Sequence, residues 1–133
     1  MPFSPGVVEA MPYSQELLPL LARTATPADQ RFSVAGAKDA MVTIDVTTSA
    51  ATPSVVATVR LVFTDSTGTK QVVAALASAA ITGAGVTNLC IGPDFADTAN
   101  VKAGLALTPE LELHLEHADA DSITYRVFVT LSK

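Results

Sequence analysis

Alternation of apolar and polar side chains over residues 40–64 constrains the fold of this chain more than any other feature. Val42, Ile44 and Val46 alternate with Thr and Asp, and a second run after Pro53 has the same period of two. This period is typical of β-strands with one face on an apolar core. The link, residues 48–54, favours a turn. We therefore expect an antiparallel hairpin that needs a second sheet to cover it. The inward positions expected in its second strand are Val55, Ala57, Val59, Leu61 and Phe63.

Further strands are expected along the rest of the chain. Residues 65–69 predict a hairpin turn in which Gly68 takes a positive φ, and residues 92–107 form the longest irregular segment. About seven short strands without a long helix predict an all-β fold, an antiparallel β-sandwich of jelly-roll or immunoglobulin-like kind. The other expected strands are residues 31–35, 70–77, 86–91, 110–117 and 123–131. Their inward positions include Leu111, Leu113, Leu115, Ile123, Tyr125, Val127, Val129 and Leu131.

Length, composition and charge exclude several classes of protein. A chain of 133 residues is most simply one domain, and 49% hydrophobic against 16% charged residues argues against disorder for most of it. The formal charge of −5 comes with no basic patch, so we expect no nucleic-acid partner. No apolar run has the length that spans a bilayer, and the first residues lack the pattern of a secretory signal. We expect no membrane partner.

Residues 1–20 differ in character from the rest and predict an extended N-terminal arm outside a single sandwich domain of residues 21–133. The arm contains four prolines, which oppose a long helix, although residues 14–22 could form a short helical turn capped by Ser14. Two interpretations stay open: the arm covers a sheet edge of its own domain, or it docks on a neighbouring subunit. Phe128 interrupts the polar face of the last strand and suggests a contact surface. The predicted assembly contacts are Phe3, Val7, Val8, Met11, Tyr13, Leu17, Leu18 and Phe128.

Candidate groups for chemistry are few. The single cysteine, Cys90, excludes an intrachain disulfide and is expected as a small buried hydrophobe rather than a reactive thiol. Glu112, His114 and Glu116 share one face of a predicted strand, but a spacing of roughly 6–7 Å is wide for one zinc ion. We therefore expect a solvated polar face there.

The sequence has no complete calcium-binding loop and no catalytic motif. Asp94, Asp97 and Asn100 could hold a cation, but they lack the spacing of a calcium-binding loop of the EF-hand type. No nucleophile elbow or phosphate loop is present. The sequence predicts no catalytic residues, no bound metal and no cofactor, so we do not expect an enzyme.

Five segments follow one another along the chain: LLARTAT, IDVT, ATPSVVATVRLVF, LASAAITGAGVTNLCIGP and HADADSITYRVFV. In this order they resemble segments of a group of small virion-associated proteins of tailed bacteriophages and prophages. The resemblance spans residues 20–131, and it departs at residues 69–73 and in the acidic strand 110–116. It implies a structural role in the particle and supplies no catalytic residues.

Within such a particle, the resemblance implies a capsid decoration (cement) protein on the outer head surface. Its partners would be further copies of itself, with a homotrimer expected, and the major capsid protein. It would be made in the cytoplasm of the bacterial host. The alternative is a tail or baseplate accessory or a host-binding module, although such a sugar-binding tip usually exposes Trp or Tyr, and this chain has no Trp and two Tyr. A third class, a cellular β-sandwich interaction domain, would need a secretion signal.

Overall fold

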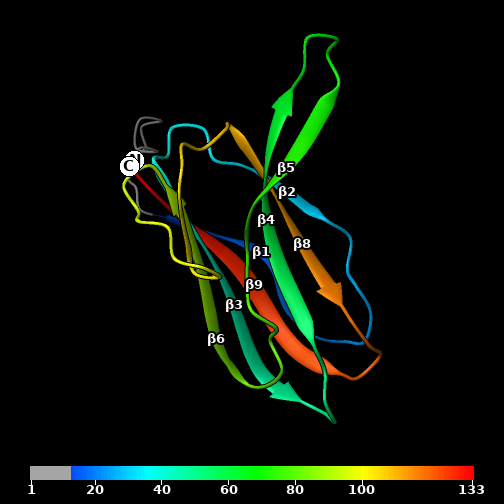
Figure 1. Ribbon diagram of the computed structural model, residues 1–133. Coiled ribbons are helices and arrows are strands. Elements are labelled where there is room, and N and C mark those ends of the chain that lie inside the picture. The colour runs from blue at the N-terminus through cyan, green and yellow to red at the C-terminus, as the bar shows by residue number, and fades with distance from the viewer. Residues whose placement is uncertain (1–12) are drawn as a thin grey trace, which may run out of the picture.

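The computed structural model describes residues 13–133 as two stacked β-sheets, with no helix in that part of the chain (Figure 1). No described helix could therefore cross a membrane. The all-β sandwich expected from the alternation is confirmed. The described strands are β1 (Tyr13–Arg23), β2 (Gln30–Ser33), β3 (Asp39–Ser49), β4 (Val55–Thr64), β5 (Lys70–Ala77), β6 (Gly85–Gly92), β7 (Lys102–Gly104), β8 (Glu110–His117) and β9 (Ile123–Ser132).

The two sheets draw strands from all parts of the chain. The five-stranded sheet has the order β1-β9-β3-β6-β7 and the four-stranded sheet the order β2-β8-β4-β5. All neighbours are antiparallel except β6 and β7, which are parallel. The short β7 lies within the segment expected to be irregular.

The predicted hairpin of residues 40–64 is wrong, because β3 and β4 lie in opposite sheets. Strand β3 pairs with β6 and β9, so both of its edges are occupied, and β4 pairs with β5 and β8. The link between them passes through Ala51, which has a φ of 56°. Alternation determines which side chains a strand buries, but it does not determine which strand lies beside it.

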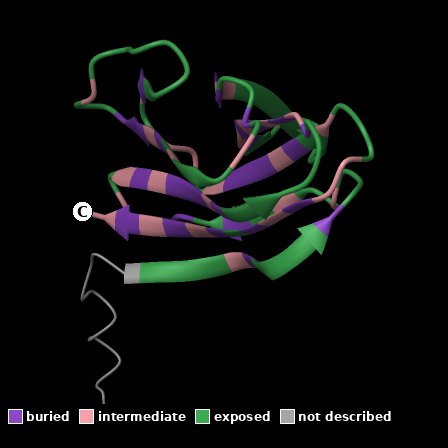
Figure 2. Cartoon of the chain, turned by 90° about the horizontal axis from the view of Figure 1, so that it is seen from below, coloured by how far each residue is buried: buried purple, intermediate pink, exposed green. Residues whose placement is uncertain are grey.

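The core forms where the inward faces of the two sheets meet (Figure 2). The inward positions expected for β3, β8 and β9 are confirmed as buried, as are those of the first half of β4. Tyr125 is only 1% exposed. The buried core side chains from these strands include Val42, Ile44, Val46, Val55, Ala57, Val59, Leu111, Leu113, Leu115, Ile123, Tyr125, Val127, Val129 and Leu131.

In the second half of β4 the inward positions leave the core, while Val62 on the other face stays buried. Leu61 lies opposite Leu111 and packs against the core from the side, but Phe63 is 42% exposed. Placing Phe63 in the core was therefore wrong, because the β4–β5 hairpin projects beyond the end of the other sheet (Figure 1). The alternation of side chains continues to Phe63, but the opposing sheet has no side chains there to cover its ring.

Strand β1 contains much of the predicted arm. It pairs antiparallel with β9 from Tyr13 opposite Leu131 to Arg23 opposite Ile123, with two irregularities in register. The helical turn expected for residues 14–22 is therefore wrong, and the predicted boundary at residue 20 falls inside β1. Pro19 is accommodated because β1 is an edge strand. The predicted contacts in residues 1–12 lie outside the described part of the chain.

Candidate functional site

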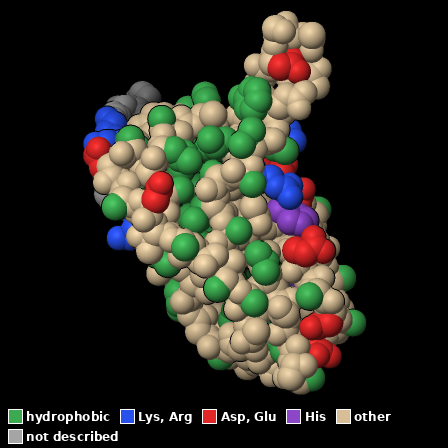
Figure 3. Space-filling view, in the orientation of Figure 1, with side chains coloured by type: hydrophobic (Ala, Val, Ile, Leu, Met, Phe, Trp, Pro, Cys, Tyr) green, Lys and Arg blue, Asp and Glu red, His purple; other side chains and the backbone are tan. Residues whose placement is uncertain are grey.

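The most exposed apolar side chains of the four-stranded sheet gather on the β4–β5 hairpin. We call Phe63, Val72 and Val73 the hairpin patch; they are 42%, 41% and 51% exposed. Figure 3 shows hydrophobic side chains at the base of this projection. Large exposed apolar side chains that cluster are typical of contact surfaces.

Cross-strand pairing places the patch on both faces of the hairpin. Val73 lies opposite Leu61, whereas Val72 lies opposite Val62. Because directly opposed side chains share a face, Val73 continues the inner, core-facing side and Val72 the outer side. Phe63 is two residues beyond Leu61 and so also lies on the inner side. The hairpin therefore exposes apolar side chains on both its inner and its outer face.

The turn of the hairpin is held by Asp65. Its Oδ1 accepts hydrogen bonds from the backbone N–H groups of Thr67 (2.9 Å) and Thr69 (3.0 Å), and its Oδ2 accepts one from Gln71 Nε2 (3.0 Å). The side-chain bonds from Thr67 and Gln71, together with the backbone bonds, hold the pKa of the Asp65 carboxyl well below its usual range. Gly68 takes the expected positive φ, at 85°. The turn is thus locally ordered without help from the core.

Strand β5 leaves one edge without a strand partner among residues 13–133. Its only neighbour in the sheet is β4, and residues 70–74 are exposed at every position. Further along, Asn100 Nδ2 donates to the carbonyl of Ala77 (3.0 Å), so the loop before β7 covers that end. An exposed apolar sheet edge is a template for pairing with another chain.

A second group of exposed apolar residues lies on β1. Leu20 and Leu21 are 52% and 57% exposed, and they lie where the register of β1 with β9 is irregular. The predicted contact Leu18 is instead part of the core, at 8% exposure, and Leu17 packs against that core. Residues 17–18 therefore stabilise their own sandwich.

Phe128, the other predicted contact in the described part of the chain, is half-buried on the outer face of β9. The guanidinium of Arg126 lies 4.8 Å from its ring centroid. The remaining predicted contacts, Phe3, Val7, Val8 and Met11, lie outside the described residues, as does the side chain of Tyr13. The residues that form the hairpin patch were not predicted as contacts. A signal was present, because Val72, Val73 and Ala74 show no polar alternation.

The outer face of the four-stranded sheet carries a network of charges. Glu112 is only 4% exposed and accepts hydrogen bonds from Arg31 Nε (2.8 Å) and Arg60 Nη1 (2.9 Å). Arg60 also lies 3.6 Å from Asp29. Burial raises the pKa of Glu112, but the two arginine hydrogen bonds outweigh burial, and the pKa is lower than usual.

His114 extends this network toward solvent. Its Nδ1 lies 2.6 Å from Asp29 Oδ1 and its Nε2 lies 2.8 Å from Glu116 Oε1. These two carboxylates raise the pKa of His114. Glu112, His114 and Glu116 do share a face, but the solvated face expected there is wrong for Glu112. Its arginine partners come from β2 and β4, far away in sequence.

The long segment between β6 and β8 is fixed by three separate contacts. Asp94 pairs with Lys38, Asp97 Oδ1 accepts the N–H of Gly104 (2.7 Å), and Asn100 bonds to Ala77. The three candidate cation ligands thus engage different partners. Among residues 13–133, no group of three or more His, Cys, Asp or Glu side chains is arranged to hold a metal ion.

Cys90 lies between two core residues, Leu89 and Ile91, and its side chain therefore points to the opposite, outer face of β6. It is half-buried, and burial raises the pKa of its thiol. The thiolate that would react is thereby disfavoured.

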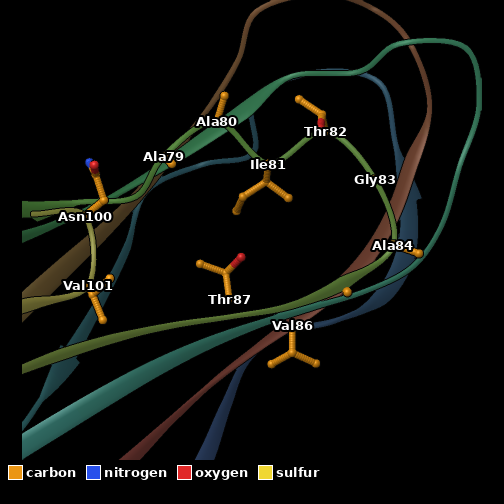
Figure 4. Close-up of a pocket in the computed structure, with 11 residues that line it drawn as sticks. Ala79, Ala80, Ile81, Thr82, Gly83, Ala84, Val86, Thr87, Asn100 and Val101 are labelled. Carbon is orange, nitrogen blue, oxygen red and sulfur yellow. The ribbon is translucent and has the colours of Figure 1, made fainter.

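A shallow depression of about 450 Å³ lies beside the loop between β5 and β6 (Figure 4). Small residues such as Ala79, Ala80 and Gly83 line it, and Asn100 and Val101 close one side. None of its lining residues carries a charge, so it offers no general acid or base.

Comparisons with known proteins find little. No protein-family model matches the chain, and no curated protein matches it. Among solved structures, the chain is similar to the C-terminal family 22 carbohydrate binding module of Clostridium thermocellum Xyn10B, with 14% identity, a TM-score of 0.46 and coverage of 90% of this chain and 81% of that one. An overlap this low assigns no function.

Proposed function

We propose that this chain is a structural protein of a tailed-bacteriophage particle, a capsid decoration protein that binds the outer head surface as a homo-oligomer, with a trimer as the first stoichiometry to test. Its partners are further copies of itself and the major capsid protein. No catalytic, metal or cofactor role is part of the proposal. The observation that carries it is the hairpin patch, a group of exposed apolar side chains beside an edge of β5 that has no strand partner among residues 13–133.

Such a surface is costly for an isolated protein and useful in an assembly. Exposed apolar side chains lose contact with water when two surfaces meet, which contributes roughly 25 cal/mol per Å² of apolar area. Small contacts repeated around a closed ring, and again on each shell subunit, add up through effective concentration. The charged side chains on the outer face of the four-stranded sheet are paired with one another, so they leave little net field for a charged ligand.

The experiment is to locate labelled protein on particles by electron microscopy. A decoration protein is expected over the whole head. Label confined to the tail would contradict the head location and support the alternative of a tail or baseplate accessory. Protein that binds no part of the particle would overturn both.

A deletion that tests whether the arm makes contacts must end before β1, and not at the predicted boundary at residue 20. Deleting residues 1–19 would remove part of β1, including the core residue Leu18. Deleting residues 1–12 leaves all described strands intact. If the arm attaches the protein to the shell or to a neighbour, this deletion should weaken attachment, with circular dichroism as the check on folding; unchanged attachment would exclude that role.

A further inference from the structure

The uncovered edge of β5 has the properties of an acceptor for an added strand. Residues 70–74 are all exposed and have β4 as their only described partner. Strand addition to such an edge joins main-chain hydrogen bonds to side-chain contacts on both faces of the sheet. Here the side chains beside the edge are Val72 on one face and Val73 on the other, and Lys70 is the only charge in the stretch.

The chain contains a segment whose chemistry fits this edge. Residues 6–11, GVVEAM, form the only proline-free run of the first twelve residues that is longer than two residues. Val7 and Val8 would point to opposite faces of an added strand, where they would meet apolar side chains on each side. Glu9 is its only charged side chain and is opposite in sign to Lys70, which also pairs with Glu110 at 2.8 Å. Proline at both ends limits the added strand to about the length of the uncovered edge.

The order of strands in the sheets excludes pairing of residues 6–11 with β5 of the same copy. Strand β5 contacts β6 and β7 across the sandwich, whereas β1 lies at the other end of its sheet. Strand spacing of about 4.8 Å places β1 and β5 roughly 15–20 Å apart across the sheet, in addition to the separation of about 10 Å between the sheets. Only Pro12 connects residues 6–11 to β1, and one residue spans at most about 3.6 Å. The acceptor edge must therefore belong to another copy.

We infer that residues 6–11 of one copy add as a strand to the uncovered edge of β5 in a neighbouring copy. The contact is head-to-tail, because the donor and acceptor surfaces differ, and such contacts close into rings when the rotation permits. The side chains of the added strand lie beside Val72 on one face of the sheet and beside Val73 on the other. The inference rests on the self-association in the proposed function, but not on the identity of the shell.

Disulfide trapping between separate chains tests the inference. Cys90→Ser serves as the background, and Val72→Cys is combined with Val7→Cys and, separately, with Val8→Cys on another chain with a tag of different size, because one of the two donor valines shares the face of Val72. Mixing and oxidation should give, with one of the two donors, a covalent dimer of one chain of each kind on a non-reducing gel. The matched control is Val86→Cys in place of Val72→Cys, because Val86 is 61% exposed on β6. Absence of the mixed dimer with both donors, or an equal yield with Val86→Cys, overturns the inference.

Molar mass measured by light scattering distinguishes residues 6–11 from other segments that could pair with the edge of β5, such as a second β5. The double variant Val7→Asp, Val8→Asp and the single variant Val73→Arg should each convert the oligomer to monomer with unchanged circular dichroism. If Val73→Arg gives monomer and the double variant remains oligomeric, two β5 edges pair with each other and the inferred donor is wrong. Mixed disulfide formation in a protein that binds no particle would leave the inference standing and refute the decoration role.

Discussion

Arg23 Nη1 donates a hydrogen bond of 2.6 Å to the main-chain carbonyl of Tyr125, and its guanidinium lies 4.6 Å from the centroid of the Tyr125 ring. The same guanidinium donates to the carbonyls of Pro19 (2.7 Å) and Leu21 (3.1 Å). These carbonyls lie where β1 departs from regular pairing with β9. One buried side chain therefore satisfies backbone groups that the irregular strand leaves without ladder partners.

Arg23→Met should weaken the attachment of β1. The substitution keeps much of the apolar stem but leaves buried carbonyls without donors, and we expect a loss of about 2–3 kcal/mol in the free energy of unfolding. Denaturation by urea measures it. Arg126→Met is the matched control, because Arg126 is exposed and its contact with Asp45 is long, at 3.4 Å; its effect should be below about 1 kcal/mol. Equal effects of the two variants would show that Arg23 does not organise β1.

Glu112→Gln should destabilise the four-stranded sheet. The carboxylate is nearly fully buried between Arg31 and Arg60, and an amide has one acceptor oxygen, so its NH2 group would face the N–H donor of one arginine. We expect a loss of about 2–4 kcal/mol. Because the pKa of Glu112 is lowered in the folded state, its contribution is present above the unfolded pKa and is lost as the pH falls below about 4. Between pH 5 and pH 3, the free energy of unfolding should therefore fall less in Glu112→Gln than in the parent protein. An equal fall in both proteins would contradict this prediction.

The two histidines should give opposite pH dependences. The carboxylates of Asp29 and Glu116 raise the pKa of His114, so its contribution is full below the unfolded pKa of about 6.5 and is lost as the pH rises through the folded value. Burial and the charge of Arg23 lower the pKa of His117, so its contribution is lost as the pH falls below about 6.5.

Thermal unfolding of two variants from pH 5 to pH 9 measures these effects. The parent protein should lose stability as the pH rises because of His114, and His114→Gln should not show this loss. The parent should also lose stability as the pH falls because of His117, and His117→Gln should not show that loss. The same change in both variants, or no change in either, would contradict the assignment of partners.

Gly104→Ala should disturb the segment between β6 and β8. A Cβ at Gly104 would lie 2.0 Å from the carbonyl oxygen of Phe95, which is a backbone atom and cannot rotate away. We expect a cost of about 1–3 kcal/mol in unfolding free energy and faster proteolysis within residues 92–107. Gly83→Ala is the control, since its Cβ would meet nothing closer than Ser49 Oγ at 4.0 Å. Retention of full stability in Gly104→Ala would mean that the segment shifts at no cost.

The candidate site was less accessible to prediction than the fold. The alternation of β8 placed Glu112 on the outer face, but its burial depends on Arg31 and Arg60, which pairing with β2 and β4 brings to it. Phe63 has the spacing of a core residue, and only the end of the opposing sheet leaves it exposed. Leu18 looked like part of a contact arm, yet pairing of β1 with β9 places it in the core.

The amino-acid sequence by itself determined that this protein is a β-sandwich and which side chains of β3, β8 and β9 are buried, because a period of two is a local property of an extended backbone. The tertiary structure alone decided that β3 and β4 lie in different sheets, that the β4–β5 hairpin projects, and that one edge of β5 has no strand partner among residues 13–133. These features depend on which distant strands compete for each edge, and that competition involves contacts among residues far apart in the chain.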